Sequence, residues 1–156
     1  MKHVVLLVIC LTFAYQSCTN SKTEKHDSSP GQLSGTWKLL QGTLIEKGDT
    51  SVTDYTKGIS FIKVINDSHF AFLQHDLTKG KGPSPVFVSG GGTYSLNGDR
   101  YSERLEYCSA REWEGNTFEF KIKMKGDTLI QEGTEKVPGT GTERVNIEKY
   151  VRLAAQ

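Results

Sequence analysis

Polar and apolar residues alternate along most of the chain after Gly35, which is the pattern of β-strands with one buried and one solvated face. In the segment 117–125, for example, Phe, Ile and Met side chains interleave with Glu and Lys. No segment shows a convincing helical period. The pattern predicts eight strands, at about 35–45, 59–65, 68–75, 86–96, 100–108, 117–125, 127–133 and 143–153.

The links between these strands alternate between short and long. Three are tight turns, whose Asn, Asp and Gly residues accept the positive φ of hairpins: Asn66-Asp67, Asn97-Gly98-Asp99 and Lys125-Gly126-Asp127. Four are long: 46–58, 76–85, 109–116 and 134–142. In an up-and-down sheet, the tight turns therefore meet at one end and the long loops at the other. We predict an all-β fold, an eight-stranded antiparallel up-and-down barrel with a closed base and a loop-fringed mouth, because closure hides the sheet edges.

The interior of this barrel is predicted to form a cup lined largely by aromatic residues. The residues expected to line it or to cover its mouth are Phe61, Phe72, Phe87, Tyr94, Glu103, Leu105, Tyr107, Trp113, Phe118, Phe120 and Gln131. An eight-stranded barrel is either filled by its own side chains or wide enough for one small ligand. The first hypothesis is non-catalytic binding of a small hydrophobic molecule. The alternative is a filled barrel whose four long loops bind a protein or a surface polymer.

Glu103 is the unusual member of this set. It shares a face with Tyr101 and Leu105, so its carboxylate is expected to point inward, where it needs a partner. Tyr94, Gln131 or an inward Arg would supply one. Two interpretations stay open, an internal hydrogen-bond network and a group that orients a ligand. A strand bulge that turned Glu103 outward would remove both.

Two short motifs at the ends of the barrel point to a known family. Gly35-Thr36-Trp37 opens the first strand and resembles the G-x-W motif of the lipocalins, and Arg152 ends the last strand, similar to the lipocalin arginine that packs over this tryptophan. From Gly35 to Leu153 the chain resembles the short lipocalin-like domains of bacterial lipoproteins, most of which have no assigned function. The resemblance implies a calycin-type barrel that binds rather than catalyses, with Gly35, Trp37 and Arg152 as a structural plug.

The first 34 residues predict export and a lipid anchor. A basic start precedes a 12-residue apolar run, 4–15, which is too short to span a bilayer and typical of a signal peptide. The run leads to Ser17-Cys18, which resembles a bacterial lipobox; ordinary secretion with cleavage after Ala14 or Ser17 is the alternative. The expected organisation is a signal peptide at 1–17, a palmitate-bearing Cys18 with a flexible tether at 18–34, the barrel at 35–153 and a tail at 154–156.

This organisation places the protein in the bacterial cell envelope, most simply at the outer membrane, with membrane contact through the lipid anchor only. Cys10 leaves with the signal peptide and Cys18 is acylated, so Cys108 has no partner within the chain. Cys108 alternates with Arg104 and Glu106 on the polar face of its strand. This position favours a spare surface thiol over a nucleophile.

Charge and composition exclude several classes of function. The 19 Lys and Arg nearly balance the 18 Asp and Glu, so no positive field steers the chain onto nucleic acid. His69 and His75 stand too far apart on one strand to share a metal ion. The triplet Gly90-Gly91-Gly92 is predicted to let a strand bend or to leave internal space, since no helix start follows it. We expect a monomer without a metal, a cofactor or catalytic residues.

Overall fold

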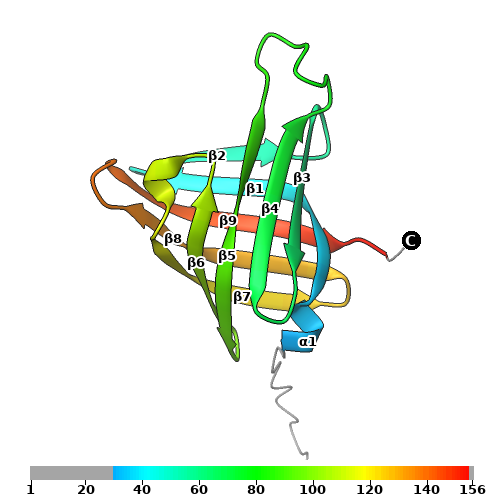
Figure 1. Ribbon diagram of the computed structural model, residues 1–156, viewed down its shortest axis with the longest axis vertical. Coiled ribbons are helices and arrows are strands. Elements are labelled where there is room, and N and C mark those ends of the chain that lie inside the picture. Colours follow the sequence, from blue (N-terminus) through cyan, green and yellow to red (C-terminus); the bar gives the residue numbers. More distant parts are fainter. Residues whose placement is uncertain (1–29, 155–156) are drawn as a thin grey trace, which may run out of the picture.

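The computed structural model describes residues 30–154, which form a closed antiparallel β-barrel (Figure 1). A short helix, α1 (Pro30–Leu33), precedes the barrel. The eight strands of its wall are β1 (Gly35–Glu46), β3 (Ile59–Ile65), β4 (His69–Asp76), β5 (Phe87–Asn97), β6 (Arg100–Cys108), β7 (Thr117–Lys125), β8 (Thr128–Val137) and β9 (Thr142–Arg152), and β9 closes on β1. The predicted fold class is confirmed. The predicted signal peptide and Cys18 lie outside the described residues.

An additional strand, β2 (Asp49–Asp54), occupies the first link, which the sequence predicts as a long loop. It forms a hairpin with the second half of β1, whereas β3 pairs only with residues 35–38 of β1. Every residue of β2 is exposed, so its sequence offers no alternating apolar face from which a strand could be inferred. The last link is also shorter than predicted, because β8 extends to Val137 and leaves only 138–141 as the turn before β9.

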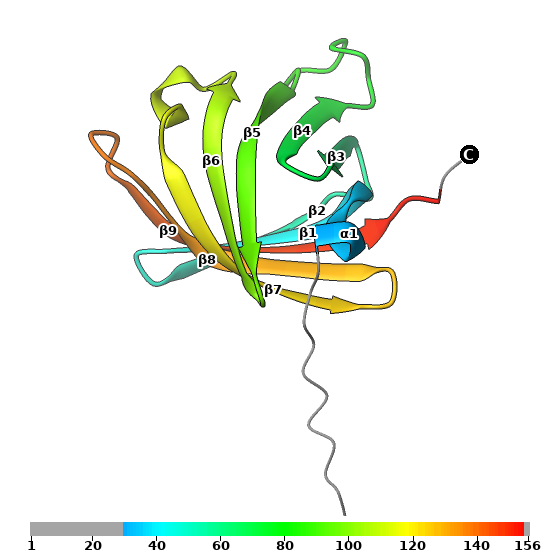
Figure 2. The same ribbon diagram turned by 60° about the horizontal axis from the view of Figure 1, so that its bottom comes forward.

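The closed end of the barrel is sealed by α1 and the first residues of β1 (Figure 2). The Arg152 guanidinium lies 4.1 Å from the centroid of the Trp37 ring and donates to the carbonyl oxygens of Ser34 and Gln32. Trp37 is fully buried, and its Nε1 donates to the carbonyl oxygen of Leu33 at 2.9 Å. The predicted packing of Arg152 over Trp37 is therefore confirmed. The helix α1 also covers this end of the barrel, although its residues were predicted to belong to the flexible tether.

Two features require a glycine at position 35, at the start of β1: its positive φ angle and the close approach of the Arg152 side chain. Its φ is 142°, and a Cβ at this position would lie 2.5 Å from the Arg152 guanidinium. A larger residue would therefore displace the arginine that closes the base. The apolar core of this end is made by Leu33, Trp37, Leu39, Ile65, Phe70, Tyr101, Ile122, Leu129 and Tyr150.

A β-bulge reverses the alternation of the last residues of β6. Gly91 pairs with Tyr107 but Gly92 pairs with Leu105, so β6 contains one extra residue at this point. As a result Tyr107 faces outward and Cys108 inward. Gly92 permits the close approach, since a Cβ there would overlap a carbonyl oxygen of β6. The glycine triplet therefore lies beside the bulge of the neighbouring strand β6.

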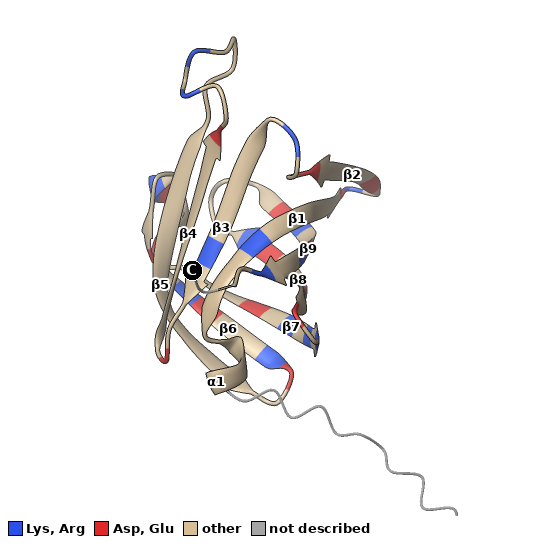
Figure 3. Cartoon of the chain, turned by 90° about the vertical axis from the view of Figure 1, so that its right-hand side faces the viewer, with Lys and Arg blue, Asp and Glu red and all other residues tan. Residues whose placement is uncertain are grey.

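Charged side chains are distributed unevenly along the strands (Figure 3). Leaving His aside, β5 contains no charged residue and β4 has only Asp76 at its end, whereas Lys and Glu recur along the outward face of β7. Within residues 30–154, no helix has the length and apolar character needed to cross a membrane.

Candidate functional site

A cavity of about 340 Å³ lies inside the barrel. Its lining extends from Lys63 and Tyr150, deep in the barrel, to Thr53 and Ala110 beside the links at the mouth. Eight of the residues predicted to line the cup do so: Phe61, Phe72, Glu103, Leu105, Trp113, Phe118, Phe120 and Gln131. The volume falls in the range of small-molecule pockets, about 300–1,000 Å³.

Two groups of aromatic rings line the cavity. Phe61 stacks on Phe72 with the ring centroids 5.8 Å apart, and Tyr55 meets Phe61 edge-on at the same centroid distance. Trp113 belongs to the 3-10 helix η1 (Arg111–Trp113) in the β6–β7 link, and its ring lies 5.7 Å from that of Phe118. Because the rings of each group pack on one another, the apolar lining is held in place by the protein itself.

A buried ion pair between Lys63 and Glu103 lies on the cavity floor, and the two side chains are only 3% and 9% exposed. The Lys63 ammonium also donates to Gln131 Oε1 at 2.9 Å. Three aromatic rings surround it with centroids 5.4, 5.5 and 5.7 Å away: Phe70, Tyr101 and Tyr150. Charges removed from water need such partners, which explains how Glu103 is tolerated inside. Glu103 points inward as predicted, and its counter-ion is a lysine rather than an arginine.

The inward position of Lys63 was not predicted, although the sequence contains a signal for it. In β3, Phe61, Lys63 and Ile65 share the inward face, so the phase of the strand places the ammonium inside the barrel. Lysine is almost never fully buried, and this general preference argues against assigning Lys63 to the interior.

A second polar cluster lies on β8 and β9, nearer the mouth. Glu135 accepts a hydrogen bond from Arg144 Nε at 2.7 Å and another from Asn146 Nδ2 at 2.8 Å. The Arg144 guanidinium also lies over the Trp113 ring, with its Cζ 5.0 Å from the ring centroid. The cluster is thus internally paired, and Arg144 connects it to the aromatic part of the lining.

Glu148 occupies the inward face of β9 between this cluster and Tyr150. The Tyr150 hydroxyl donates to Glu148 Oε2 at 2.8 Å. Burial raises the pKa of the Glu148 carboxyl, although the Lys63 charge and the hydrogen bond from Tyr150 act in the opposite direction. Burial also raises the pKa of the Tyr150 hydroxyl well above its ordinary value.

The inward polar residues of β9, which we call the polar wall together with Glu135 of β8, were not predicted from the sequence. In β9 the polar side chains face the interior and the apolar ones face outward, which is the reverse of the usual arrangement. Arg144, Asn146 and Glu148 line the cavity, whereas Val145 and Ile147 take the outward face and are half-buried there. A reading that assigns the apolar face of a strand to the interior selects the wrong face here.

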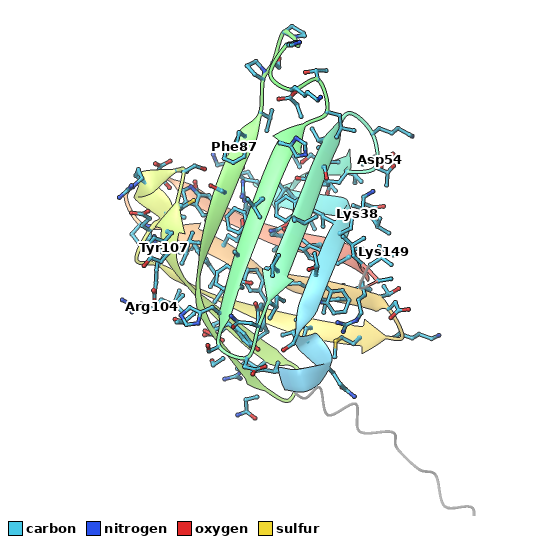
Figure 4. All side chains as sticks on the ribbon, turned by 45° about the vertical axis from the view of Figure 1, so that its right-hand side comes forward. Lys38, Asp54, Phe87, Arg104, Tyr107 and Lys149 are labelled. Atoms are coloured by element: carbon cyan, nitrogen blue, oxygen red, sulfur yellow. The ribbon has the colours of Figure 1, made fainter. Side chains whose placement is uncertain are left out.

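Three residues predicted to line the cup lie elsewhere. Tyr107 and Phe87 are 70% and 68% exposed on the outside of the barrel (Figure 4). The bulge turns Tyr107 outward, and Phe87 alternates with Val88, which takes the inward position. Tyr94 lies toward the closed end, where its hydroxyl donates to the Asn66 carbonyl oxygen at 2.7 Å. The prediction that these three side chains line the cup is wrong.

Cys108 also differs from its predicted place on the polar face of the strand. It is half-buried and lines the cavity, because the bulge reverses its orientation. Burial raises the pKa of its thiol, and the neighbouring carboxylates of Glu114 and Glu112 add to this effect. The protonated thiol is therefore favoured, which makes Cys108 a weak nucleophile at neutral pH.

The fold and the cavity together define a class of protein: an eight-stranded antiparallel barrel with a ligand-sized internal space that aromatic rings and paired polar side chains line. Across the part of the chain that the structure describes, no three His, Cys, Asp or Glu side chains gather as metal ligands would.

Comparisons with known proteins add no function. No protein-family model matches the chain, and no curated protein does. The crystal structure of an uncharacterized protein from Bacteroides eggerthii DSM 20697 is similar, with 14% sequence identity and a TM-score of 0.43 over 77% of this chain and 98% of that chain. The structure shows an eight-stranded antiparallel barrel, and a calycin-type or lipocalin-like relationship stays a prediction.

Proposed function

We propose that this protein binds one small molecule inside its barrel without transforming it. The observation that supports the proposal is the cavity of about 340 Å³, which reaches Lys63 and Glu103 in the middle of the barrel. If Phe72, Phe118 and Phe120 met across the barrel and filled it, no cavity would reach these two residues. Because the rings are packed on one another, binding requires little rearrangement of the apolar lining.

The aromatic and polar parts of the lining suggest an amphipathic ligand rather than a purely hydrophobic one. Its apolar body would lie against Phe61, Phe72 and Phe118, and its polar part would face β8 and β9. Buried polar side chains that already have partners fix the orientation of a ligand more than they add to its affinity.

Binding without catalysis is part of the proposal. Among the described residues, no histidine lines the cavity, and the pKa of the Cys108 thiol is raised rather than lowered. The two cations of the lining each pair with a carboxylate. A nucleophile with an adjacent general base is the arrangement that covalent catalysis would need.

The proposed location is a bacterial membrane surface, to which a lipid on Cys18 would hold the barrel. This part rests on the sequence alone, since Cys18 lies outside the described residues. The chain enters the barrel at the closed base, through α1 and Gly35. The mouth would therefore face away from the membrane that holds the anchor.

A second candidate is an interaction with a protein or a surface polymer through the mouth loops. It is favoured by exposed apolar side chains beside the β4–β5 link, where Leu77 is 55% exposed and Phe87 lies on the outer surface. Such patches occur at interaction sites. The binding experiment described next distinguishes this candidate from ligand binding inside the barrel.

Native mass spectrometry of the full chain and titration with N-phenyl-1-naphthylamine, an uncharged apolar fluorophore, test binding in the cavity. Ala110→Trp places a large side chain in the cavity mouth, and Thr134→Trp places the same side chain on the exposed outer face of β8. We expect saturable binding to the wild type and to Thr134→Trp, and loss of binding in Ala110→Trp. Equal binding to all three proteins, or none to the wild type, contradicts the proposal and favours the loops.

A further inference from the structure

The charges that face the cavity do not balance. Five charged side chains line it: Lys63, Glu103, Glu135, Arg144 and Glu148. Lys63 pairs with Glu103, and Arg144 pairs with Glu135 at 2.7 Å. Glu148 is left over, because among residues 30–154 no Lys or Arg forms an ion pair with it. The ionised cavity therefore has one carboxylate more than it has cations.

The space in front of Glu148 suits a positively charged group. Gly42 pairs with Glu148 across β1 and β9, so no side chain of β1 covers the carboxylate. The Tyr55 ring lies over Gly42, where an added Cβ would be 3.0 Å from the ring. Phe61 lies 5.8 Å from Tyr55 and 6.3 Å from Tyr150, measured between ring centroids. Aromatic faces attract cations, so the carboxylate and the rings favour the same kind of occupant.

The barrel already holds one ammonium in this manner. Lys63 pairs with the Glu103 carboxylate, and its Nζ lies within 6 Å of the centroids of three rings, including that of Tyr150. Tyr150 also donates its hydroxyl to Glu148. The same ring therefore borders both an occupied cation position and the unpaired carboxylate.

An anionic ligand group would fit less well. To pair with Lys63 or Arg144 it would have to displace Glu103 or Glu135, which would leave a buried carboxylate without a cation. A cationic group requires no such exchange.

We propose that the ligand bound in this cavity carries a protonated amine that pairs with Glu148, while its apolar body lies against Phe61 and Phe72. This inference rests on the proposed function, since it names the ligand chemistry of the same cavity. Glu148 would then select between ligands of similar shape by their charge.

Three probes that share an indole ring test the inference: tryptamine, which is cationic, tryptophol, which is neutral, and indole-3-acetate, which is anionic. Calorimetric titration of the full chain is expected to give a Kd for tryptamine at least about tenfold lower than those for the other two. Glu148→Gln should remove this preference, because the Kd for tryptamine should rise at least about tenfold and much more than the Kd for tryptophol. Glu132→Gln, on the exposed face of β8, removes the same charge outside the cavity and should keep the preference.

Each other outcome contradicts a defined part of the argument. If tryptophol or indole-3-acetate binds the wild type as tightly as tryptamine, the amine is not selected, although the cavity still binds small molecules. If Glu148→Gln keeps the preference for tryptamine, the amine pairs with another group. If none of the three indoles binds, the inference fails, and the N-phenyl-1-naphthylamine titration decides separately whether the proposed function also fails.

Discussion

Lys63 and Glu103 form an ion pair across the interior of the barrel, from strands β3 and β6 that are not neighbours in the sheet. The pair lies at the floor of the cavity, which Tyr150 of the closed-end core also lines. It also ties together two strands that share no backbone hydrogen bonds. The stability of the barrel therefore depends on the two charges being present together.

Removing one partner of this pair should be strongly destabilising. Lys63→Met leaves the Glu103 carboxylate buried without a cation, and we expect a loss of about 3–5 kcal/mol in the free energy of unfolding. The double variant Lys63→Met/Glu103→Leu should recover most of that loss. Urea denaturation measures both. Lys121→Met, which breaks the exposed pair with Asp99, should cost no more than about 1 kcal/mol.

If the double variant is as unstable as Lys63→Met, the cost does not arise from an unpaired charge. The lost packing of the lysine stem among the aromatic rings would then account for it.

The bulge in β6 predicts opposite effects for two residues that a regular strand would place on the same face. Leu105 is buried and lines the cavity, so Leu105→Ala should cost about 2–5 kcal/mol of unfolding free energy. Tyr107 is exposed, so Tyr107→Ser should change stability by less than about 1 kcal/mol and leave probe binding unaltered. Urea denaturation and the fluorophore titration check both variants. A loss of binding in Tyr107→Ser would contradict the outward orientation.

Glu148 should make the protein less stable as the pH rises. Burial raises the pKa of this carboxyl above its ordinary value of 4.5, so between the two values the native state binds more protons than the unfolded state. Stability due to this group is thus fully present below about pH 4.5 and is lost as the pH rises through the raised pKa. The charged groups that act on it are Lys63, Glu103 and Glu135, and Tyr150 donates to it.

Glu148→Gln isolates this effect. The variant should be more stable than the wild type at pH 7 and equal to it at pH 4, as measured by urea denaturation between these values. Glu132→Gln serves as the control, because its side chain is exposed on the same strand pair. A difference between Glu148→Gln and the wild type that does not change with pH would show that ionisation of Glu148 is not its cause.

Cys108 should report occupancy of the cavity. Its thiol lines the cavity and has a raised pKa, so alkylation by iodoacetamide at pH 8 should be slower than that of an unfolded cysteine peptide. A saturating cavity ligand should slow it further, by severalfold, whereas denaturation in urea should restore the fast rate. Peptide mapping by mass spectrometry assigns the modification to Cys108. Alkylation at the same rate with and without ligand would place the ligand away from this side of the cavity.

Much of the fold followed from local patterns in the sequence. Alternation and turn residues located the eight strands of the wall to within a few residues, because one solvated and one buried face impose a period of two. The contact between Trp37 and Arg152 was implied by the resemblance to the lipocalins, and strand order agrees with it, since the first and last strands of a closed barrel are neighbours. β2 could not be found in this way, because it buries no face against the core.

The candidate site was only partly predictable. The sequence by itself determined that Phe61, Phe72, Glu103 and Phe118 face inward, because their strands alternate regularly around them. Tertiary structure decided the partners of Glu103, the outward turn of Tyr107 and the polar wall that contains Glu148. These features depend on a bulge and on contacts between strands far apart in the chain, and a period of two in one strand contains no information about either.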